Sequence, residues 1–270
     1  METKPILFSG PMVRAILERR KTMTRRVISW DHRAIGFDGR NKLYKMVDEL
    51  NGKPFFGAGF FKDSDVFEID GERHVDAVYY KCNWQPGDIL WVRETWGYHQ
   101  DSYGDAWPIF YRADYPEGAT TFPWGGKDEE GEEIICDLPR KWHPSIFMPK
   151  EAARLFLRVT DVRAERLQEI TEEDAIREGI MFTDFGMDTN RGQASLDGGI
   201  TFHPIKPVQH PGFHAGDATR PSQCHESARF AFADLWEKLN GKRGYGWSTN
   251  PWVWVISFER ADKPAGWPEV

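Results

Sequence analysis

The segment ILFSGPMVRAILERRKTMTRRVI, which runs from Ile6 to Ile28, holds the signals for a strand, a helix and a second strand in close succession. Its first three residues are an apolar run typical of a strand. Gly10 and Pro11 then suit the N-cap and the first turn of a helix. The apolar residues of that helix fall on one face: Met12, Val13, Ile16 and Leu17. With residues 22–28 extended, this order predicts a mixed α+β fold.

Basic residues are concentrated where this predicted helix ends, near residue 19. Residues 14–26 carry six positive charges and one negative charge, although the whole chain has a net charge of −7. Clustered cations favour an anionic ligand, such as a phosphate, a carboxylate or a nucleotide. They would also hold the pKa of Lys21 below the value of about 10.4 of a free lysine. A solvated helix end is the alternative, because cations there interact favourably with the helix dipole.

Composition limits the class of protein. The chain has 270 residues, of which 40% are hydrophobic, enough for a sizeable core. Three cysteines without a CxxC spacing, Cys82, Cys136 and Cys224, argue against a disulfide scaffold. No apolar run approaches the ~20 residues of a membrane span, and residues 1–5 do not resemble a signal peptide. We therefore expect a cytoplasmic protein with no membrane association, whose acidic surface is unsuited to wrapping a long polyanion.

The rest of the chain alternates periodic and irregular segments. The turn at 86–88 leads into the first of three further predicted strands, at residues 89–95, 154–163 and 252–258. Thr171 opens a capping box for a short helix that Gly179 ends, and a longer helix is predicted over residues 227–239. The apolar positions of the longer helix are Phe230, Phe232, Leu235, Trp236 and Leu239.

The periodic segments amount to about 100 residues, the size of one small domain, and consist of residues 5–30, 86–96, 153–180 and 224–260. The segments between them are predicted to be insertions, at residues 31–85, 97–152 and 181–223. Tryptophans in or beside these insertions favour packed lids over disorder: Trp84, Trp107, Trp124 and Trp142. We therefore expect residues 1–270 to form a single domain, a small barrel of strands with short flanking helices and long insertions.

Three motifs resemble the ASCH domain family: Lys21-Thr22-x-Thr24-x-Arg26 after the helix, Pro86-Gly87-Asp88-x-Leu90-x-Val92, and the closing aromatic strand. The chain is most similar to the long phage and prophage members, through Trp91-Val92-Arg93-Glu94-Thr95-Trp96, His143-Pro144-Ser145-Ile146-x-Met148-Pro149, Glu165-Arg166-Leu167-Gln168 and Asn250-Pro251-Trp252-Val253-Trp254. The resemblance implies a PUA-like β-barrel, a fold that generally binds RNA or modified bases. The family usually has glycine where Arg19 stands.

The resemblance also implies an activity. One small bacterial ASCH protein is an N4-acetylcytidine amidohydrolase that uses a lysine, a threonine and a glutamate. When the two are aligned, the lysine and the threonine fall on Lys21 and Thr24. The glutamate, which ends a short helix opened by Thr-Glu, falls on Glu178. That small enzyme has none of the long insertions predicted here.

Amide hydrolysis needs a nucleophile, a base that takes its proton and a donor to the leaving nitrogen. Thr24 can be the nucleophile if Lys21, surrounded by arginines, is deprotonated part of the time. Glu178 would orient the lysine or shuttle the proton, whereas an exposed Glu178 with no catalytic role is the alternative. In a regular strand, Lys21 and Thr24 would point to opposite faces. The catalytic set therefore requires that Lys21 still belong to the helix exit.

Other polar residues of these motifs are predicted to contact the ligand, a nucleoside or a short nucleic acid: Arg20, Arg25, Arg26 and Glu94. Glu94 alternates with Val92 on an apolar strand, so an inward orientation would require a partner. Arg26 and Arg93 are the arginines considered for that pairing. The histidines and the cysteine between residues 203 and 225 lie in a segment rich in proline and glycine. One spacing, His210-x3-His214, is permitted for zinc, but we expect no metal or cofactor.

Two other classes of function stay open at this point. A non-catalytic RNA- or DNA-binding module of phage origin would hold its ligand in the same basic cleft. A ribonuclease would use Lys21 and Glu178 as acid and base on a phosphodiester. The sequence does not determine the substrate or the oligomeric state.

Overall fold

The computed structural model divides into two compact units. The first unit consists of Met1–Glu165 and Trp252–Val270, and the second consists of Arg166–Pro251. The residues that the structure describes are 2–28, 43–47, 54–59, 66–69, 72–75, 77–80, 82–98, 109–127, 131–188, 193–194, 203–204, 208–216 and 218–268. A single domain over residues 1–270 stays a prediction.

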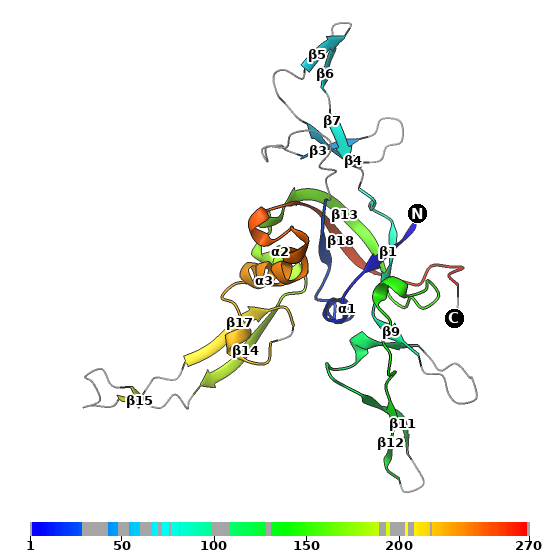
Figure 1. Ribbon diagram of the computed structural model, residues 1–270, viewed down its shortest axis with the longest axis vertical. Coiled ribbons are helices and arrows are strands. Elements are labelled where there is room, and N and C mark those ends of the chain that lie inside the picture. The colour runs from blue at the N-terminus through cyan, green and yellow to red at the C-terminus, as the bar shows by residue number, and fades with distance from the viewer. Residues whose placement is uncertain are drawn as a thin grey trace. The chain divides into compact units, whose positions relative to one another are not determined.

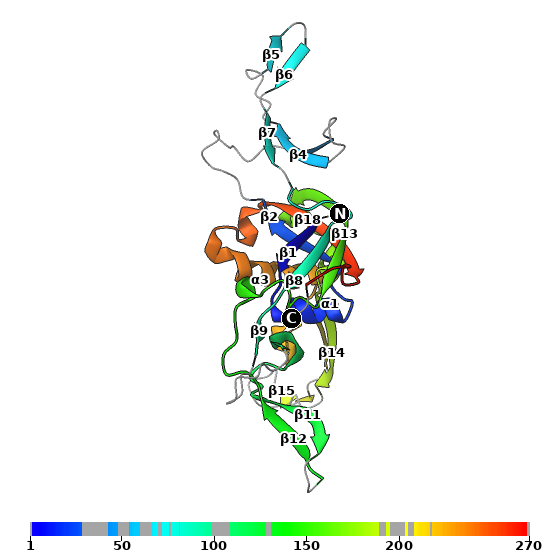
Figure 2. The same ribbon diagram turned by 90° about the vertical axis from the view of Figure 1, so that its right-hand side faces the viewer.

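A five-stranded sheet organises the first unit (Figures 1 and 2). Its order is β1 (Thr3–Leu7), β8 (Ile89–Arg93), β13 (Phe156–Arg166), β18 (Trp252–Ala261) and β2 (Met23–Val27). β1 is parallel to β8, whereas β13 is antiparallel to β8 and β2 is antiparallel to β18. β13 is long and curved (Figure 1). This sheet therefore confirms the four predicted strands and the extended segment predicted after the first helix. The fold is mixed α+β, with mostly strands.

The core of the first unit joins this sheet to helix α1 (Gly10–Leu17). Val13 and Ile16 of the helix belong to one buried apolar cluster with Leu90 and Val92 of β8. The helix places these two residues on one face because they are three positions apart. On β18, both faces are buried from Trp252 through Phe258, so the tryptophans of that strand are core residues.

The second unit contains α2 (Glu172–Arg177), α3 (Ala228–Asn240), β14 (Met181–Asp188) and β17 (Val208–His214). Both helices begin as predicted: Thr171 Oγ1 accepts a hydrogen bond from Asp174 N–H at 3.1 Å, and Ser227 Oγ accepts one from Phe230 N–H at 3.2 Å. Gly179, with φ of 103°, ends the first helix.

The buried face of α3 does not include all the apolar positions of the predicted helix. It consists of Ala228, Ala231, Phe232, Trp236 and Asn240. Phe230 and Leu239, two of the apolar positions of the predicted helix, are 59% and 47% exposed. The residues at 228, 232, 236 and 240 repeat every four positions and share a face, whereas Phe230 falls midway between two of them and points to the other side.

Smaller sheets lie within the predicted insertions. One has three strands, β3 (Leu43–Val47), β4 (Pro54–Gly59) and β7 (Ala77–Tyr80). The others are pairs: β5 (Val66–Ile69) with β6 (Glu72–Val75), β9 (Trp96–Gly97) with β10 (Phe110–Tyr111), β11 (Thr121–Lys127) with β12 (Glu133–Asp137), β14 with β17, and β15 (Gln193–Ala194) with β16 (His203–Pro204). Trp84 packs partly buried against the core, and the Trp142 ring lies 6.4 Å from that of Tyr115. Trp107 and the side chain of Trp124 lie outside the described residues.

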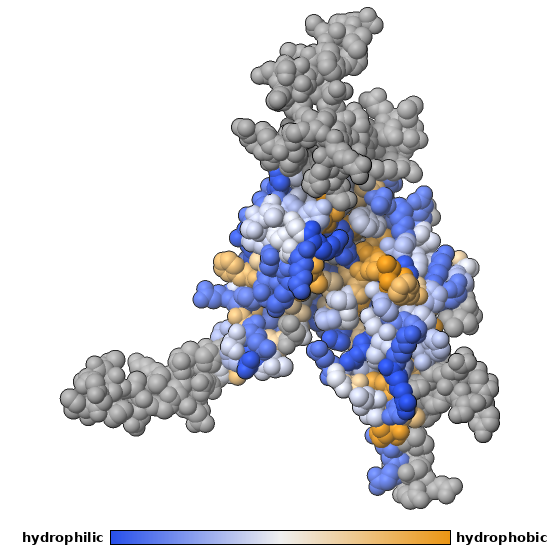
Figure 3. All heavy atoms as spheres, viewed as in Figure 1, coloured by the Kyte–Doolittle hydropathy of each residue, from blue (hydrophilic) through white to orange (hydrophobic). Residues whose placement is uncertain are grey.

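Three observations bear on the predicted class of protein. All three cysteines are free thiols, as expected. None of the helices within the described ranges has the length and hydropathy needed to span a lipid bilayer. On the face seen in Figure 3, hydrophobic residues reach the surface in patches bordered by hydrophilic ones; exposed large apolar side chains include Ile146 and Phe147.

Candidate functional site

The exit of α1 has the geometry of a helix end at which glycine is the preferred residue. Arg19 N–H donates to Ile16 O at 3.0 Å and Arg20 N–H donates to Ala15 O at 2.8 Å, the two hydrogen bonds of a Schellman motif. Arg19 has φ of 61°, in the left-handed region. That conformation costs an L-amino acid roughly 1–2 kcal/mol, a cost that glycine avoids. Arg19 therefore holds a strained backbone.

Lys21 belongs to this helix exit and not to the following strand. Its N–H donates to Ala15 O at 3.0 Å, and β2 begins only two residues later. Alternation along β2 therefore does not force the Lys21 side chain away from that of Thr24, which lies opposite Ile256 of β18. Lys21 Nζ lies 5.8 Å from the centroid of the Phe8 ring, a cation–π distance.

The predicted catalytic residues are all buried. Lys21 is 2% exposed, Thr24 is 3% exposed and Glu178 is 6% exposed. Only nine polar or charged residues of the described ranges are buried, and these three are among them. Lysine and glutamate are almost never buried to this degree without a partner or a function.

Glu178 lies in the second unit, where it is the C-cap residue of α2. Its N–H donates to Asp174 O at 2.8 Å. A carboxylate at this end of a helix faces the negative end of the dipole, which disfavours it. The side chain is buried, so the alternative is wrong in expecting an exposed Glu178, whereas a catalytic role for Glu178 stays a prediction.

The arginines predicted to contact the ligand have intramolecular partners. Arg20 Nη2 lies 2.5 Å from Glu18 Oε2. The Arg25 side chain is fully buried, and its Nη2 lies 2.5 Å from Glu165 Oε1. Arg26 Nη2 donates to Leu7 O at 2.7 Å, and its guanidinium lies over the Phe8 ring. Much of the positive charge that the sequence concentrates here is therefore engaged within the first unit. Ligand contact by these arginines stays a prediction.

Glu94 is paired, but with an arginine that sequence reasoning did not select. Arg154 Nε and Nη2 donate to the two oxygens of Glu94 at 2.9 and 3.0 Å, and the same guanidinium binds Asp114. Burial raises the pKa of Glu94 above its ordinary value, and the hydrogen bonds from Arg154 offset part of that rise. The expected partners, Arg26 and Arg93, are wrong because their guanidinium groups donate to backbone carbonyl oxygens instead. Sixty residues separate the true pair, and no local spacing links them.

A cavity of about 320 Å³ lies beside Lys21 within the first unit. It is lined by Ile16, Arg19, Lys21, Thr22, Phe258, Glu259 and Arg260. Its size is at the lower end of small-molecule sites. Sequence reasoning named Lys21 among these residues but selected neither Arg19 nor Arg260 as a ligand contact. The one available signal was that arginine replaces the usual glycine at position 19.

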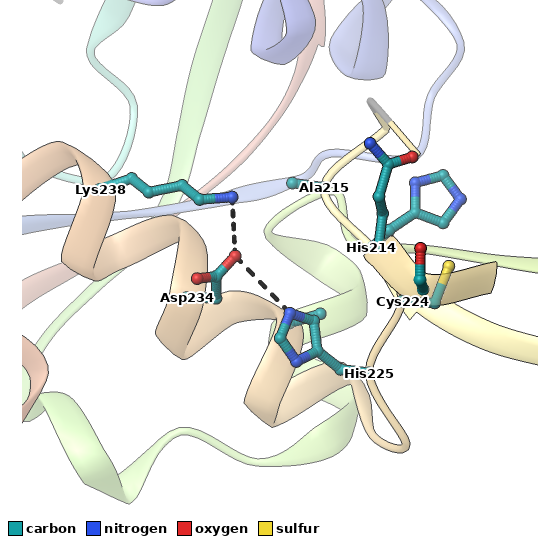
Figure 4. A pocket seen from close by; sticks show the side chains of 9 residues that line it. His214, Ala215, Cys224, His225, Asp234 and Lys238 are labelled. Carbon is teal, nitrogen blue, oxygen red and sulfur yellow. Dashed lines mark ion pairs between the residues drawn. The ribbon is translucent and has the colours of Figure 1, made fainter. Parts of the chain in front are cut away.

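A second cavity, of about 270 Å³, lies within the second unit (Figure 4). His225 and Lys238 both point toward Asp234 there: His225 Nε2 lies 3.6 Å and Lys238 Nζ lies 2.8 Å from Asp234 Oδ2. The hydrogen bond from Lys238 lowers the pKa of Asp234 below its ordinary value. One side of this cavity is therefore lined by ion-paired side chains.

The histidines considered for zinc do not assemble a metal site in the described part of the chain. Gly216 N–H donates to His214 Nδ1 at 3.0 Å, and His214 Nε2 lies 2.8 Å from Thr183 Oγ1, so both ring nitrogens have partners. Among the described residues, no group of three or more His, Cys, Asp or Glu residues is arranged to hold a metal ion. The side chains of His203 and His210 lie outside the described residues.

Comparison of the chain with protein-family models, with curated proteins and with solved structures gave no match in any of the three.

Proposed function

We propose that this chain is an ASCH-type protein with a PUA-like barrel, and that it hydrolyses the amide of an N4-acylated cytidine or a related acylated nucleoside. Lys21 is the base, Thr24 is the nucleophile, and Glu178 orients the lysine or shuttles its proton. One observation carries the proposal: the three side chains that the sequence motif selects are all buried, although they are polar. The part of Glu178 comes from the resemblance and not from a distance.

The proposed reaction balances without a cofactor. Thr24 Oγ bonds to the amide carbonyl carbon while the neutral Lys21 amine takes the hydroxyl proton. That proton passes to N4 of the cytidine as the C–N bond breaks, and an acyl ester stays on Thr24. Water then attacks the ester carbonyl while Lys21 accepts a proton from it. The ester C–O bond breaks, Lys21 returns that proton to Thr24 Oγ, and the carboxylic acid leaves with both residues in their starting states.

The pairing of arginines with carboxylates in this region favours a small ligand over a long nucleic-acid strand. A protein that tracks a phosphate backbone presents several exposed cations, because neutralised phosphates provide most of the affinity. Arg25 is instead fully buried against Glu165, and Arg20 is paired with Glu18. The cavity beside the buried Lys21 has the size of a site for part of a small ligand and not for a long strand.

The experiment is a hydrolysis assay with wild type and two pairs of variants. Wild type and Lys21→Arg are incubated with a panel of N4-acylated cytidines, and the released cytidine is measured by chromatography. Lys21→Arg should lose activity by at least a hundredfold, because a guanidinium keeps the charge but cannot act as a base. The exposed Lys242→Arg is the matched control and should retain full activity. Thr24→Ala should be as inactive as Lys21→Arg, whereas Thr24→Ser keeps a hydroxyl and should retain part of the activity.

The assay can fail in two informative ways. Absence of hydrolysis by wild type across the panel would refute the amidohydrolase proposal and favour a non-catalytic binding module. Hydrolysis that persists in Lys21→Arg would refute the assignment of the base. Circular dichroism of each variant checks that lost activity does not come from lost fold.

A further inference from the structure

Two arginines, Arg19 and Arg260, line the cavity beside Lys21. Arg19 lines the cavity from the exit of α1, and Arg260 lines it from the end of β18. In the part of the chain that the structure describes, neither side chain takes part in an ion pair or a side-chain hydrogen bond. By contrast, Arg20 and Arg25 are each paired with a carboxylate. Both of these arginines therefore line one cavity.

Arg19 stands in a conformation that glycine adopts without strain, with φ of 61°. The helix end does not need its side chain, since the carbonyls of Ala15 and Ile16 already accept backbone hydrogen bonds. Backbone strain at a residue whose side chain supports no local contact points to a role at a binding site. The Arg19 side chain, which lines the cavity, is therefore the candidate for that role.

The charged wall of the cavity is mostly cationic and comes from two segments far apart in the sequence. Its charged residues are Arg19, Lys21, Glu259 and Arg260, three positive and one negative. Phe258 N–H donates to Thr22 O at 2.9 Å, and this hydrogen bond ties β18 to the helix exit. The cations are therefore held together by the fold before any ligand arrives.

We infer that this cavity binds the phosphate group of a nucleotide, so that the protein acts on a phosphorylated cytidine derivative and not on the free nucleoside. Guanidinium groups bind phosphate oxygens through paired, charge-assisted hydrogen bonds, and Arg19 and Arg260 offer two such groups. The identity of the nucleoside rests on the proposed function. Phosphate binding at Arg19 and Arg260 does not depend on hydrolysis.

The test compares the binding of cytidine 5′-monophosphate and of cytidine by isothermal titration calorimetry at one ionic strength. Wild type should bind the monophosphate at least tenfold more tightly. Arg19→Gly and Arg260→Gln should each remove most of that preference and leave the affinity for cytidine unchanged. Arg19→Gly is suited to the test because glycine tolerates the left-handed backbone, so the variant keeps its fold. Arg19→Lys keeps a cation and should retain part of the preference.

The exposed Arg158 provides the matched control. Arg158→Gln removes one positive charge from the same unit, and its affinity for the monophosphate should match that of wild type. Equal affinities of wild type for the monophosphate and for cytidine, or an undetectable affinity for the monophosphate, would overturn the inference. An unchanged preference in both Arg19→Gly and Arg260→Gln would also overturn it.

Two further results show which kind of phosphate binds and distinguish the phosphate site from the proposed hydrolysis. If the trinucleotide CpCpC binds more tightly than the monophosphate, the cavity holds the phosphodiester of a strand. If the monophosphate binds more tightly, the cavity holds a terminal phosphate. Both results support the inference. Monophosphate binding that depends on Arg19, without hydrolysis of any acylated cytidine, refutes the proposed function and keeps the phosphate site. Hydrolysis of an acylated cytidine, without preference for the monophosphate in binding, supports the proposed function and refutes the phosphate site.

Discussion

Replacement of Arg19 by glycine is expected to stabilise the protein. The backbone of Arg19 has φ of 61°, and the left-handed region costs an L-amino acid roughly 1–2 kcal/mol. The greater freedom of glycine in the unfolded chain offsets about 0.4–1 kcal/mol of that gain. The hydrogen bonds to Ile16 O and Ala15 O come from backbone groups and remain in the variant. The free energy of unfolding should therefore rise by about 0.5–1 kcal/mol.

The assay is thermal and urea unfolding followed by circular dichroism. A gain of this size corresponds to a rise in Tm of roughly 2 °C for a chain of this length. Arg19→Ala is the control, since it removes the same guanidinium but keeps the β-carbon and its strain. Its stability should stay within about 0.3 kcal/mol of wild type. Gly179, with φ of 103°, gives the reciprocal test, because Gly179→Ala should destabilise the protein by about 1–2 kcal/mol.

Two results would refute this reasoning. A lower stability of Arg19→Gly would mean that the arginine side chain makes stabilising contacts at the helix exit. Equal stability changes in the glycine and alanine variants would assign the effect to the removed charge and not to the backbone.

Three further predictions concern other parts of the molecule. Arg154→Met should lower the free energy of unfolding by about 3 kcal/mol at pH 7 in urea titrations, because it leaves Glu94 charged and buried. The loss should shrink as the pH falls toward about 4. Burial raises the pKa of Glu94, so the carboxyl group becomes protonated as the pH falls, and the variant then no longer buries an unpaired charge. A loss that is the same at both pH values would contradict this. Thr171→Ala should cost about 1 kcal/mol through loss of the N-cap of α2, measured by thermal unfolding against Thr171→Ser, which keeps the cap. Burial raises the pKa of Cys82 to about 11, so iodoacetamide at pH 8 should label this thiol much more slowly than Cys136, as read by peptide mass spectrometry.

Local sequence determined the strands of the five-stranded sheet and the helices, but not the strands within the predicted insertions. The apolar face from Met12 to Leu17 and the residues after it predicted α1 and β2, and the cap at Thr171 predicted where α2 begins. These signals act over one to four residues, through backbone hydrogen bonds and side-chain periodicity, and the sequence displays them directly. The motif around Lys21 and Thr24 likewise identified residues that the fold buries.

Tertiary structure alone decided which charges are engaged and which are free. Arg25 meets Glu165 across 140 positions and Glu94 meets Arg154 across 60, so no spacing rule connects them. A charge count of the basic segment treated its arginines as equivalent, yet the sheet buries one of them against a carboxylate and leaves Arg19 at a cavity. Arg260 joins that cavity because β18 pairs with β2, a contact between the two ends of the chain. Long-range pairing of this kind depends on how strands assemble, and the sequence of either segment does not contain it.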